Sequence, residues 1–252
     1  MVTSWDGRPR VSVVMAVRDV EAYVREAIDS ILTQTYGDFE LIIVDDGSTD
    51  ATPAILHEAA MRDRRVVGIT QRPVGIAAAL NAGLTMARGV YVARQDGDDV
   101  SLPTRLARQV DFLDSHPEIA MVGSFAEVVT SHGCHIANEQ FPVDHRSLRA
   151  ALWDLAHPRN CFRHGSLLIR RAALLEVGGY RPEFPVCEDY DLYLRLVERF
   201  RLANIAETLY VYRVHQASTS SRFPALLKRY NALAREMACQ RRAAGRAESR
   251  ES

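Results

Sequence analysis

The sequence predicts an α/β fold in which a mixed, mainly parallel central sheet is flanked by helices. Short continuous apolar runs rich in valine and isoleucine, typical of strands buried on both faces, recur along the first hundred residues. Between them lie segments of about 10 to 15 residues with apolar side chains at helical spacing. The 252 residues are 47% hydrophobic and 25% charged, a composition that suits a globular chain with a sizeable core.

The first part of the chain alternates strand and helix. Strands are expected at 11–17, 39–46, 66–70 and 90–95, and helices at 21–35, 52–62 and 75–89. Thr52 is the expected N-cap of the second helix, and Pro53 its first helical residue. Strands separated by helices of this length are joined by crossovers and lie parallel. This part is therefore expected to form half of a Rossmann-like layer.

The regular alternation ends after Pro103. Helices are expected at 104–116, 145–157, 172 to Gly178 or Gly179, and 187–200, and strands at 119–130, 135–141, 165–171 and 208–214. The strands at 119–130 and 135–141 flank the turn-like tetrad SHGC and are expected to pair antiparallel. No linker divides the chain, so residues 1–221 are expected to form one domain. A basic tail at 222–252, rich in alanine and arginine, is expected to be a mobile helix.

Charge and cysteine content exclude several classes of function. The formal net charge is −1, from 31 basic and 32 acidic residues, so no global field attracts nucleic acid. The four cysteines, Cys134, Cys161, Cys187 and Cys239, are far apart and lack metal-site spacing, as expected for reduced thiols in the cytoplasm. No apolar run reaches the length of a membrane span. We expect a soluble cytoplasmic protein that has no nucleic-acid partner, whose basic tail would permit peripheral contact with the membrane's inner face.

Paired aspartates follow two of the predicted parallel strands. Asp45 and Asp46 come after LIIV, and Asp96 and Asp98 come after VYVARQ. Turns between strands and helices favour aspartate for capping and backbone reasons alone. In open α/β sheets, however, ligands bind beyond the carboxyl ends of the strands. Two such pairs at the same sheet edge favour a binding site.

Missing motifs narrow the choice of ligand. There is no GxGxxG after the first strand and no GxxxxGK[ST], so no glycine loop cradles phosphates. The carboxylates of Asp96 and Asp98 are hard oxygen ligands, which suit Mg²⁺ or Mn²⁺ bound together with substrate phosphates. A carboxylate such as that of Asp46 can accept a hydrogen bond from a base N–H. These features favour a nucleotide diphosphate.

The chain resembles glycosyltransferase family 2, whose members are inverting enzymes with the GT-A fold. The resemblance runs from about residue 10 to 220. It rests on VSVVMAVRDVEAYVREAIDSILTQTYGDFELIIVDDGSTDAT, GIAAALNAGLTMARGVYVARQDGDDVSLPTRL and GGYRPEFPVCEDYDLYLRL, in this order and spacing. It implies a nucleotide-binding half at about 10–102 and an acceptor-side half at 103–221.

The resemblance implies roles for residues on the nucleotide side. Ala16, Val17 and Arg18 follow the first strand and would contact the base, and Asp46 would accept from a pyrimidine N3–H. Asp45 would order the turn. The family often has VYN where this chain has VRD, so an aromatic residue that might stack on the base is replaced by arginine.

The resemblance also implies the chemical centre. Asp98 would be the principal metal ligand, with Asp96 near the ribose or a metal-bound water and Asp99 supporting the turn or capping the next helix. Glu188 and Asp189 match the family's ED motif, and Asp189 would be the catalytic base; helix capping is the alternative reading of this pair.

Five further residues have open roles. Arg72 could meet the diphosphate or the base, or lie in a solvated loop. Asn81 could face the nucleotide, although helix packing is the commoner explanation. His215 follows the last strand in a YRxH pattern and is a candidate metal or diphosphate contact, whereas His164 is expected to shape the acceptor side. Trp153 could contact an acceptor sugar or lipid, but a core position is the simpler expectation.

The resulting hypothesis is a Mn²⁺- or Mg²⁺-dependent hexosyltransferase. It would move a sugar, with inversion, from a nucleotide-diphosphate donor, with UDP favoured, to a saccharide or lipid-linked saccharide in surface glycan assembly. Two alternatives stay open: a sugar-1-phosphate nucleotidylyltransferase, which would need a glycine-rich basic N-terminal loop that MAVRDVEAY lacks, and a catalytically silent nucleotide-sugar-binding module.

Overall fold

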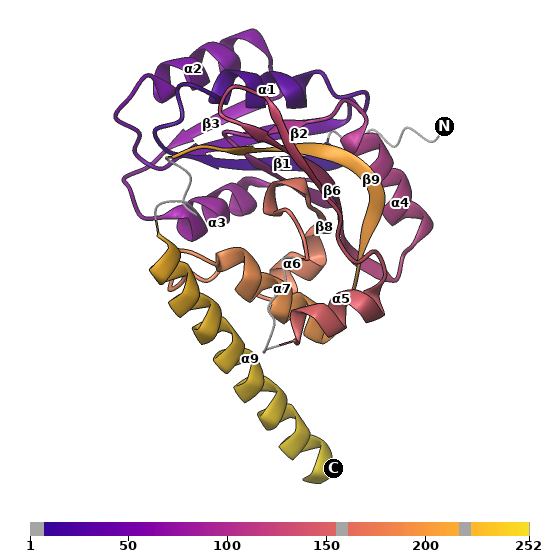
Figure 1. Cartoon of the computed structure of the whole chain (residues 1–252). Helices are drawn as coiled ribbons and strands as arrows, with labels where there is room; N and C mark the ends of the chain where they lie inside the picture. Colours follow the sequence, from indigo (N-terminus) through magenta and orange to yellow (C-terminus); the bar gives the residue numbers. More distant parts are fainter. Residues whose placement is uncertain (1–7, 155–160, 217–222, 252) are drawn as a thin grey trace.

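The computed structural model describes residues 8–154, 161–216 and 223–251, and its core is a nine-stranded sheet with helices on both faces (Figure 1). The strands are β1 (Val11–Val17), β2 (Phe39–Asp45), β3 (Val66–Thr70), β4 (Tyr91–Asp96), β5 (Val100–Ser101), β6 (Ile119–Thr130), β7 (His135–Glu139), β8 (Leu168–Arg170) and β9 (Arg201–Val214). The helices are α1 (Val24–Leu32), α2 (Thr52–Arg62), α3 (Ile76–Met86), α4 (Arg105–Ser115), α5 (His145–Leu152), α6 (Arg171–Glu176), α7 (Glu188–Arg199), α9 (Pro224–Glu251) and the short 3-10 helix η1 (His164–Ser166).

The first four strands form the predicted parallel layer. Their order is β3-β2-β1-β4, with Val11 of β1 opposite Phe39 of β2 and Tyr91 of β4. Alternate side chains of β1 enter two separate apolar clusters: Val13 packs with α1, α2 and α4, and Val14 packs with α3, α6 and α7. Because both faces are covered, these strands have the continuous apolar runs from which they were predicted.

The second half adds antiparallel and parallel strands to the same sheet. β6 and β7 form the predicted antiparallel hairpin, with Ala126 opposite Glu139. β8 runs antiparallel between β4 and β6, and is shorter than predicted because residues 164–166 form η1. β9 runs parallel to β6 and starts at Arg201, seven residues before the predicted strand at 208.

The predicted N-cap of α2 is wrong. Ala51 occupies the cap position, and Thr52 is the first helical residue. The Thr52 hydroxyl accepts a hydrogen bond from the backbone N–H of Val20 at 3.0 Å, and its own N–H donates to a carboxylate oxygen of Asp50 at 2.9 Å. Thr52 therefore ties the loop after β1 to the start of α2. The predicted end of α6 is confirmed, since Gly178 and Gly179 both have positive φ.

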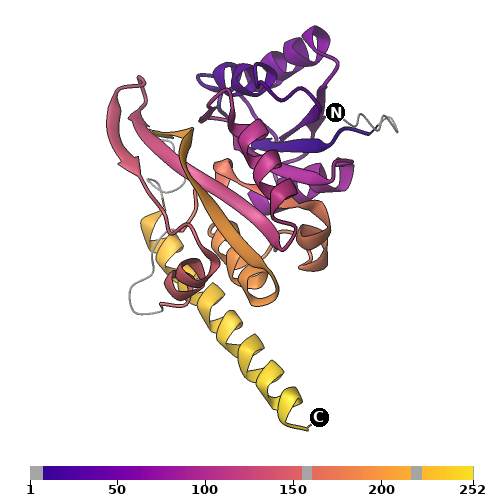
Figure 2. The ribbon, with the colours of Figure 1, turned by 90° about the vertical axis from the view of Figure 1, so that its right-hand side faces the viewer.

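The tail is helical, as predicted, but its first half is packed rather than mobile. Ala234 and Ala238 of α9 are fully buried in the cluster that contains Leu192 of α7. Arg241 donates two hydrogen bonds of 2.9 Å to the carboxylate of Glu198 on α7. Figures 1 and 2 both show the C-terminal half of α9 extending beyond the body of the fold.

Within the described ranges, no helix combines the length and the apolar character that a bilayer crossing requires.

Candidate active site

The strand register brings the predicted acidic pairs to one edge of the sheet. Val17 at the end of β1 lies opposite Asp45 at the end of β2, and Ala16 lies opposite Asp96 at the end of β4. The carboxyl ends of three parallel strands therefore meet there, as the sequence predicted. The residues expected to contact a base and those expected to bind a metal follow these strand ends.

The carboxylate of Asp46 organises the loop before α3. Its Oδ1 accepts from the side-chain amide of Gln71 at 2.7 Å and from the N–H of Val74 at 2.9 Å, and its Oδ2 accepts from the N–H of Gly75 at 2.8 Å. A negative group is favoured at this helix N-terminus. Each carboxylate oxygen has two acceptor positions, so Oδ2 keeps one for a donor such as a base N–H. The base-binding role of Asp46 stays a prediction.

The turn after β2 depends on a glycine and on Asp45. The Oδ1 of Asp45 accepts from the N–H of Ser48 at 2.9 Å, so this buried carboxylate orders the turn. Gly47 has a φ of +75°, and a Cβ there would lie 2.6 Å from Cδ of Pro73. The turn therefore requires glycine at this position.

Two predicted nucleotide-side arginines are exposed. The side chain of Arg18 is 53% exposed and lies 3.7 Å from the carboxylate of its neighbour Asp19. Arg72 is exposed and makes no hydrogen bond or ion pair with the part of the chain that the structure describes. Both guanidiniums are free to reach a bound anion, and their roles stay predictions.

Asp96 rests on a buried arginine that the sequence analysis missed. Arg94 is 2% exposed, and its guanidinium donates to Oδ1 of Asp96 at 2.6 Å. Residues two apart on a strand share a face, so a charged residue inside the apolar run YVARQ was the available signal. Burial raises the pKa of Asp96 above its ordinary value, although the charge of Arg94 opposes that shift.

The last strand holds the Asp98 and Asp99 loop in place. The Nε2 of His215 lies 2.7 Å from Oδ2 of Asp98, and the backbone carbonyl of Asp98 accepts from Arg213 at 3.0 Å. Asp99 is buried and accepts from the backbone N–H of Arg213 at 2.8 Å, which agrees with its expected part in the turn. Burial raises the pKa of Asp99 well above its usual value, and the negative charges of Asp98 and Asp96 raise it further.

The carboxylate of Asp98 and the imidazole of His215 fit two positions around a small divalent cation. Adjacent ligands about 2.1 Å from Mg²⁺ in octahedral geometry lie roughly 3 Å apart, close to the 2.7 Å between these two atoms. Across the described ranges, no group of three or more His, Cys, Asp and Glu side chains could hold a metal. Donor phosphates or water would have to supply the remaining ligands, as is usual for Mg²⁺.

Glu188 and Asp189 occupy the first turn of α7. Oδ1 of Asp189 accepts from the N–H of Tyr190 at 2.7 Å, so Asp189 also stabilises the helix start. Burial, then the charge of Asp189, raises the pKa of Glu188 to about 8. Burial also raises the pKa of Asp189. Glu188 is therefore mostly protonated at neutral pH.

His164 is a neutral group beside these carboxylates, and 11% of its side chain is exposed. Its Nε2 lies 2.9 Å from the hydroxyl of Tyr180, and its Nδ1 lies 3.8 Å from a carboxylate oxygen of Glu188. Burial, then the nearby charge of Arg94, lowers the pKa of His164 well below its usual value. His164 thus joins the segment beside β4 to the start of α7.

Two other candidates lie outside this cluster of ionisable groups. The side chain of Asn81 on α3 donates to the carbonyl of Tyr180 at 2.7 Å and accepts from its N–H at 2.9 Å, so Asn81 fixes the loop that leads to α7. Trp153 follows α5 and contacts α9, where Arg242 lies 4.1 Å from the ring centroid. It is half-buried rather than a core residue.

Sequence reasoning also missed two residues that contact Asp96, Tyr210 on β9 and Gly165 in η1. The hydroxyl of Tyr210 accepts from the N–H of Asp96 at 3.3 Å, and a Cβ at Gly165 would lie 2.7 Å from Oδ2 of Asp96. A tyrosine in an apolar strand carries no signal of this contact, because the contact depends on how β9 crosses the sheet.

Comparison with known proteins agrees with this arrangement. The family described as Glycosyl transferase family 2 matches residues 12–177. The O-antigen biosynthesis glycosyltransferase WbnJ of Escherichia coli is 36% identical over 215 residues, which cover 83% of this chain and 81% of that protein.

Two solved structures share the fold at low sequence identity. The structure of S. aureus TarS 1–349 in complex with UDP-GlcNAc has a TM-score of 0.68 at 20% identity, over 84% of this chain and 61% of that one, so this chain spans less than two thirds of that structure. The mannosyltransferase PcManGT of Pyrobaculum calidifontis, in complex with GDP-Man and Mn²⁺, has a TM-score of 0.64 at 20% identity, over 95% and 76% of the two chains. The family match and the identity to WbnJ show that the chain belongs to glycosyltransferase family 2, and the structural matches show that it has the GT-A fold.

Proposed function

We propose that this glycosyltransferase moves a hexose from a nucleotide-diphosphate donor, with UDP as the favoured nucleotide, to an acceptor hydroxyl with inversion at the anomeric carbon. The observation that carries the proposal is that the carboxyl ends of β1, β2 and β4 lie close to the N-terminus of α7. The ends of β2 and β4, which lead to Asp46 and to Asp96 and Asp98, flank the end of β1 at one edge of the sheet. Asp189 in the first turn of α7 lies near enough to Asp96 to interact with its charge.

On the donor side, Ala16, Val17 and Asp46 would contact the base, and the exposed guanidiniums of Arg18 and Arg72 would approach the base or the diphosphate. The carboxylate of Asp46 is held in place by the loop before α3, so a base N–H would meet an oriented acceptor.

On the phosphate side, Asp98 and His215 would hold a Mn²⁺ or Mg²⁺ ion, with Asp96 beside it. When bound, such an ion stabilises the negative charge that develops on a leaving diphosphate. The buried guanidinium of Arg94 keeps Asp96 in position. It also supplies a fixed positive charge under this acidic loop.

On the acceptor side, Asp189 would remove the proton of the attacking hydroxyl. The hydroxyl oxygen bonds to the anomeric carbon from the face opposite the nucleotide, and the bond to the diphosphate oxygen breaks, so the leaving group takes the electron pair. A carboxylate whose pKa is raised by burial is a better base near neutral pH, and such a base typically contributes about 10² to 10⁴ in rate. Glu188 is a poorer candidate for this role because its raised pKa keeps it mostly protonated.

The acceptor we propose is a saccharide or lipid-linked saccharide in surface polysaccharide assembly. The support is the relative WbnJ, which is named for O-antigen biosynthesis and whose sequence this chain matches over 81% of its length. The use of a divalent metal is supported by PcManGT, which is described in complex with GDP-Man and Mn²⁺.

Thermal unfolding with UDP, dTDP and GDP, each with and without Mn²⁺, tests the donor and metal together. A ligand that binds the folded state raises the melting temperature by mass action. We expect UDP with Mn²⁺ to give the largest rise, and Asp98→Asn to remove the metal-dependent part of it. If no nucleotide stabilises the protein in a metal-dependent way, the proposal fails.

A further inference from the structure

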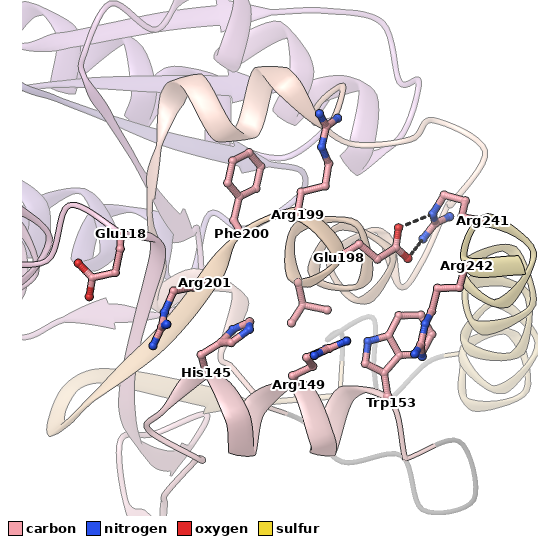
Figure 3. Close-up of a pocket in the computed structure, with 11 residues that line it drawn as sticks. Glu118, His145, Arg149, Trp153, Glu198, Arg199, Phe200, Arg201, Arg241 and Arg242 are labelled. Carbon is pink, nitrogen blue, oxygen red and sulfur yellow. Dashed lines mark hydrogen bonds and ion pairs between the residues drawn. The ribbon is translucent and has the colours of Figure 1, made fainter. Parts of the chain in front are cut away.

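A pocket of about 560 Å³ lies between α5, the end of α7, the start of β9 and α9 (Figure 3). Its lining is dominated by five arginines: Arg149, Arg199, Arg201, Arg241 and Arg242. Two glutamates, Glu118 and Glu198, also line it, which leaves a formal excess of three positive charges. Because the whole chain carries a net charge of −1, this excess is a local property of the pocket.

The pocket is separate from the candidate active site. Asp189 lies in the first turn of α7 and Glu198 in the last, so the two ends are about 14 Å apart at 1.5 Å per residue. Trp153, considered above as a possible acceptor contact, lines this pocket, but none of the residues proposed to bind the donor or the metal or to act as the base does. A ligand bound here would not compete directly for those groups.

Two of the five arginines are already neutralised. Arg241 is paired with Glu198 across the interface between α9 and α7, and Arg199 is paired with Glu176 at 2.6 Å. The first pair joins α9 to α7, and the second joins α7 to α6.

The other three arginines have no carboxylate partner among residues 8–154, 161–216 and 223–251. The side chains of Arg149 and Arg201 make neither a hydrogen bond nor an ion pair with those residues, and the guanidinium of Arg242 lies over the ring of Trp153. In Figure 3 the guanidinium of Arg149 points toward Trp153, and Arg201 lies beside His145 at the other end of the pocket. The charges of Arg149 and Arg201 both act on His145 between them, and a bound anion would offset this unbalanced positive charge.

His145 adds a neutral donor to these cations. Its Nδ1 accepts from the backbone N–H of Leu202 at 3.3 Å, which leaves the ring proton on Nε2. Burial, then the charges of Arg201 and Arg149, lowers the pKa of His145. The ring is therefore uncharged at neutral pH and can donate one hydrogen bond without adding to the positive charge.

We propose that this pocket binds a phosphate group, either as free phosphate or diphosphate or as the headgroup of an anionic lipid. The planar guanidinium fork matches the oxygens of a phosphate, and a phosphate offers more charge and more acceptors than a single carboxylate. Three unpaired arginines from three elements suit such a multiply charged anion. The inference rests on this pocket alone and does not depend on the proposed sugar transfer.

Fluorescence of Trp153 measures binding of the free anion. The other tryptophan, Trp5, lies outside the described residues, so the titration uses a Trp5→Phe background. Phosphate and pyrophosphate are added in EDTA, so that pyrophosphate cannot bind through a metal at the active site. We expect saturable binding that Arg149→Gln with Arg201→Gln weakens by at least about tenfold, because two guanidiniums that could make charge-assisted hydrogen bonds are removed. The control Arg64→Gln removes an exposed arginine outside the pocket and should leave binding unchanged.

Co-sedimentation with vesicles measures the lipid source. Vesicles of phosphatidylcholine alone are compared with vesicles that also contain phosphatidic acid. If phosphate or pyrophosphate binds and the double variant binds it more weakly, the proposal is supported and the ligand is a soluble anion. Binding only to the acidic vesicles, again weakened by the double variant, supports it with a lipid headgroup. No binding in either assay, or equal binding by the double variant and Arg64→Gln, would overturn it.

Folding and the proposed function are checked separately in the same variants. Both substituted arginines are exposed, so the double variant should melt as the parent does. If the double variant melts at a lower temperature than the parent, Arg149→Gln alone is used in both assays. Weaker binding by Arg149→Gln then supports the proposal, and unchanged binding overturns it. Stabilisation by UDP and Mn²⁺ should be unchanged in either variant, so failure of the phosphate site and failure of the sugar transfer give different results.

Discussion

Replacing Arg94 with methionine is expected to destabilise the fold by about 3 kcal/mol, because Asp96 loses its buried partner. The Arg94 side chain is 2% exposed and that of Asp96 is 28% exposed, with 2.6 Å between the paired atoms. Removing one partner of a buried pair costs about 3 to 5 kcal/mol. The expected loss lies at the low end, because water can partly hydrate the Asp96 carboxylate.

Thermal unfolding followed by circular dichroism measures this loss. For a domain of this size, about 3 kcal/mol corresponds to a fall of roughly 6 to 12 °C in melting temperature. The control is Arg25→Met, because Arg25 makes an ion pair of 2.7 Å with Glu58 in which both side chains are about half exposed, and its removal should change the melting temperature little. Combining Arg94→Met with Asp96→Asn should recover part of the loss, since no unpaired charge then stays in the site. Equal melting of Arg94→Met and Arg25→Met would refute the reasoning.

Three further outcomes are expected. Gly47→Ala should cost about 1 to 3 kcal/mol in urea unfolding, because a φ of +75° disfavours a side chain and the new Cβ would lie 2.6 Å from Pro73. Gly37→Ala, with nothing within 4 Å of the new Cβ, should be nearly neutral. The pKa of Glu188 is about 8 in the folded state, against an ordinary value of 4.5. Between these two pH values the folded state keeps the carboxyl proton that the unfolded state has lost, so the free energy of unfolding falls as the pH rises from about 4.5 to about 8. Unfolding of Glu188→Gln measured from pH 5 to 8 should lack this fall, and a parallel pH dependence in both proteins would contradict it. His215→Ala should remove the Mn²⁺-dependent part of nucleotide stabilisation and leave the metal-free part unchanged.

The parallel layer could be predicted because each of its strands is buried on both faces. An apolar run such as that of β2 needs no knowledge of its neighbours, and the two aspartates after it mark the strand end. The start of β9 could not be predicted in this way, because RLANIAE has a polar residue at every third position, which is neither a continuous apolar run nor the alternation typical of a strand. The segment becomes a strand only by pairing with β6. The packing of α9 depends on small residues, Ala234 and Ala238, whose burial no local pattern signals.

In the candidate site, too, the features set by local sequence could be predicted and those set by tertiary contacts could not. The ends of β1, β2 and β4 could be placed at one edge because the crossover rule fixes their direction. The contacts of Arg94 with Asp96 and of His215 with Asp98 required the three-dimensional arrangement, although the charge at Arg94 in an apolar strand was a usable signal. The cap predicted for Thr52 failed because its hydroxyl binds the loop after β1 instead of its own helix.

Transfer of labelled sugar from a UDP-sugar by Asp189→Asn tests the central claim most directly. Wild type and variant are compared with Glu183→Gln, which changes an exposed carboxylate near the same helix start. Saccharides and lipid-linked saccharides serve as acceptors, and the anomeric configuration of the product is read by NMR. We predict that wild type and Glu183→Gln give product with inverted configuration, and that Asp189→Asn loses about 10² to 10⁴ in rate while still being stabilised by UDP and Mn²⁺. Transfer by Asp189→Asn at the wild-type rate, or a product with retained configuration, would contradict the proposed mechanism.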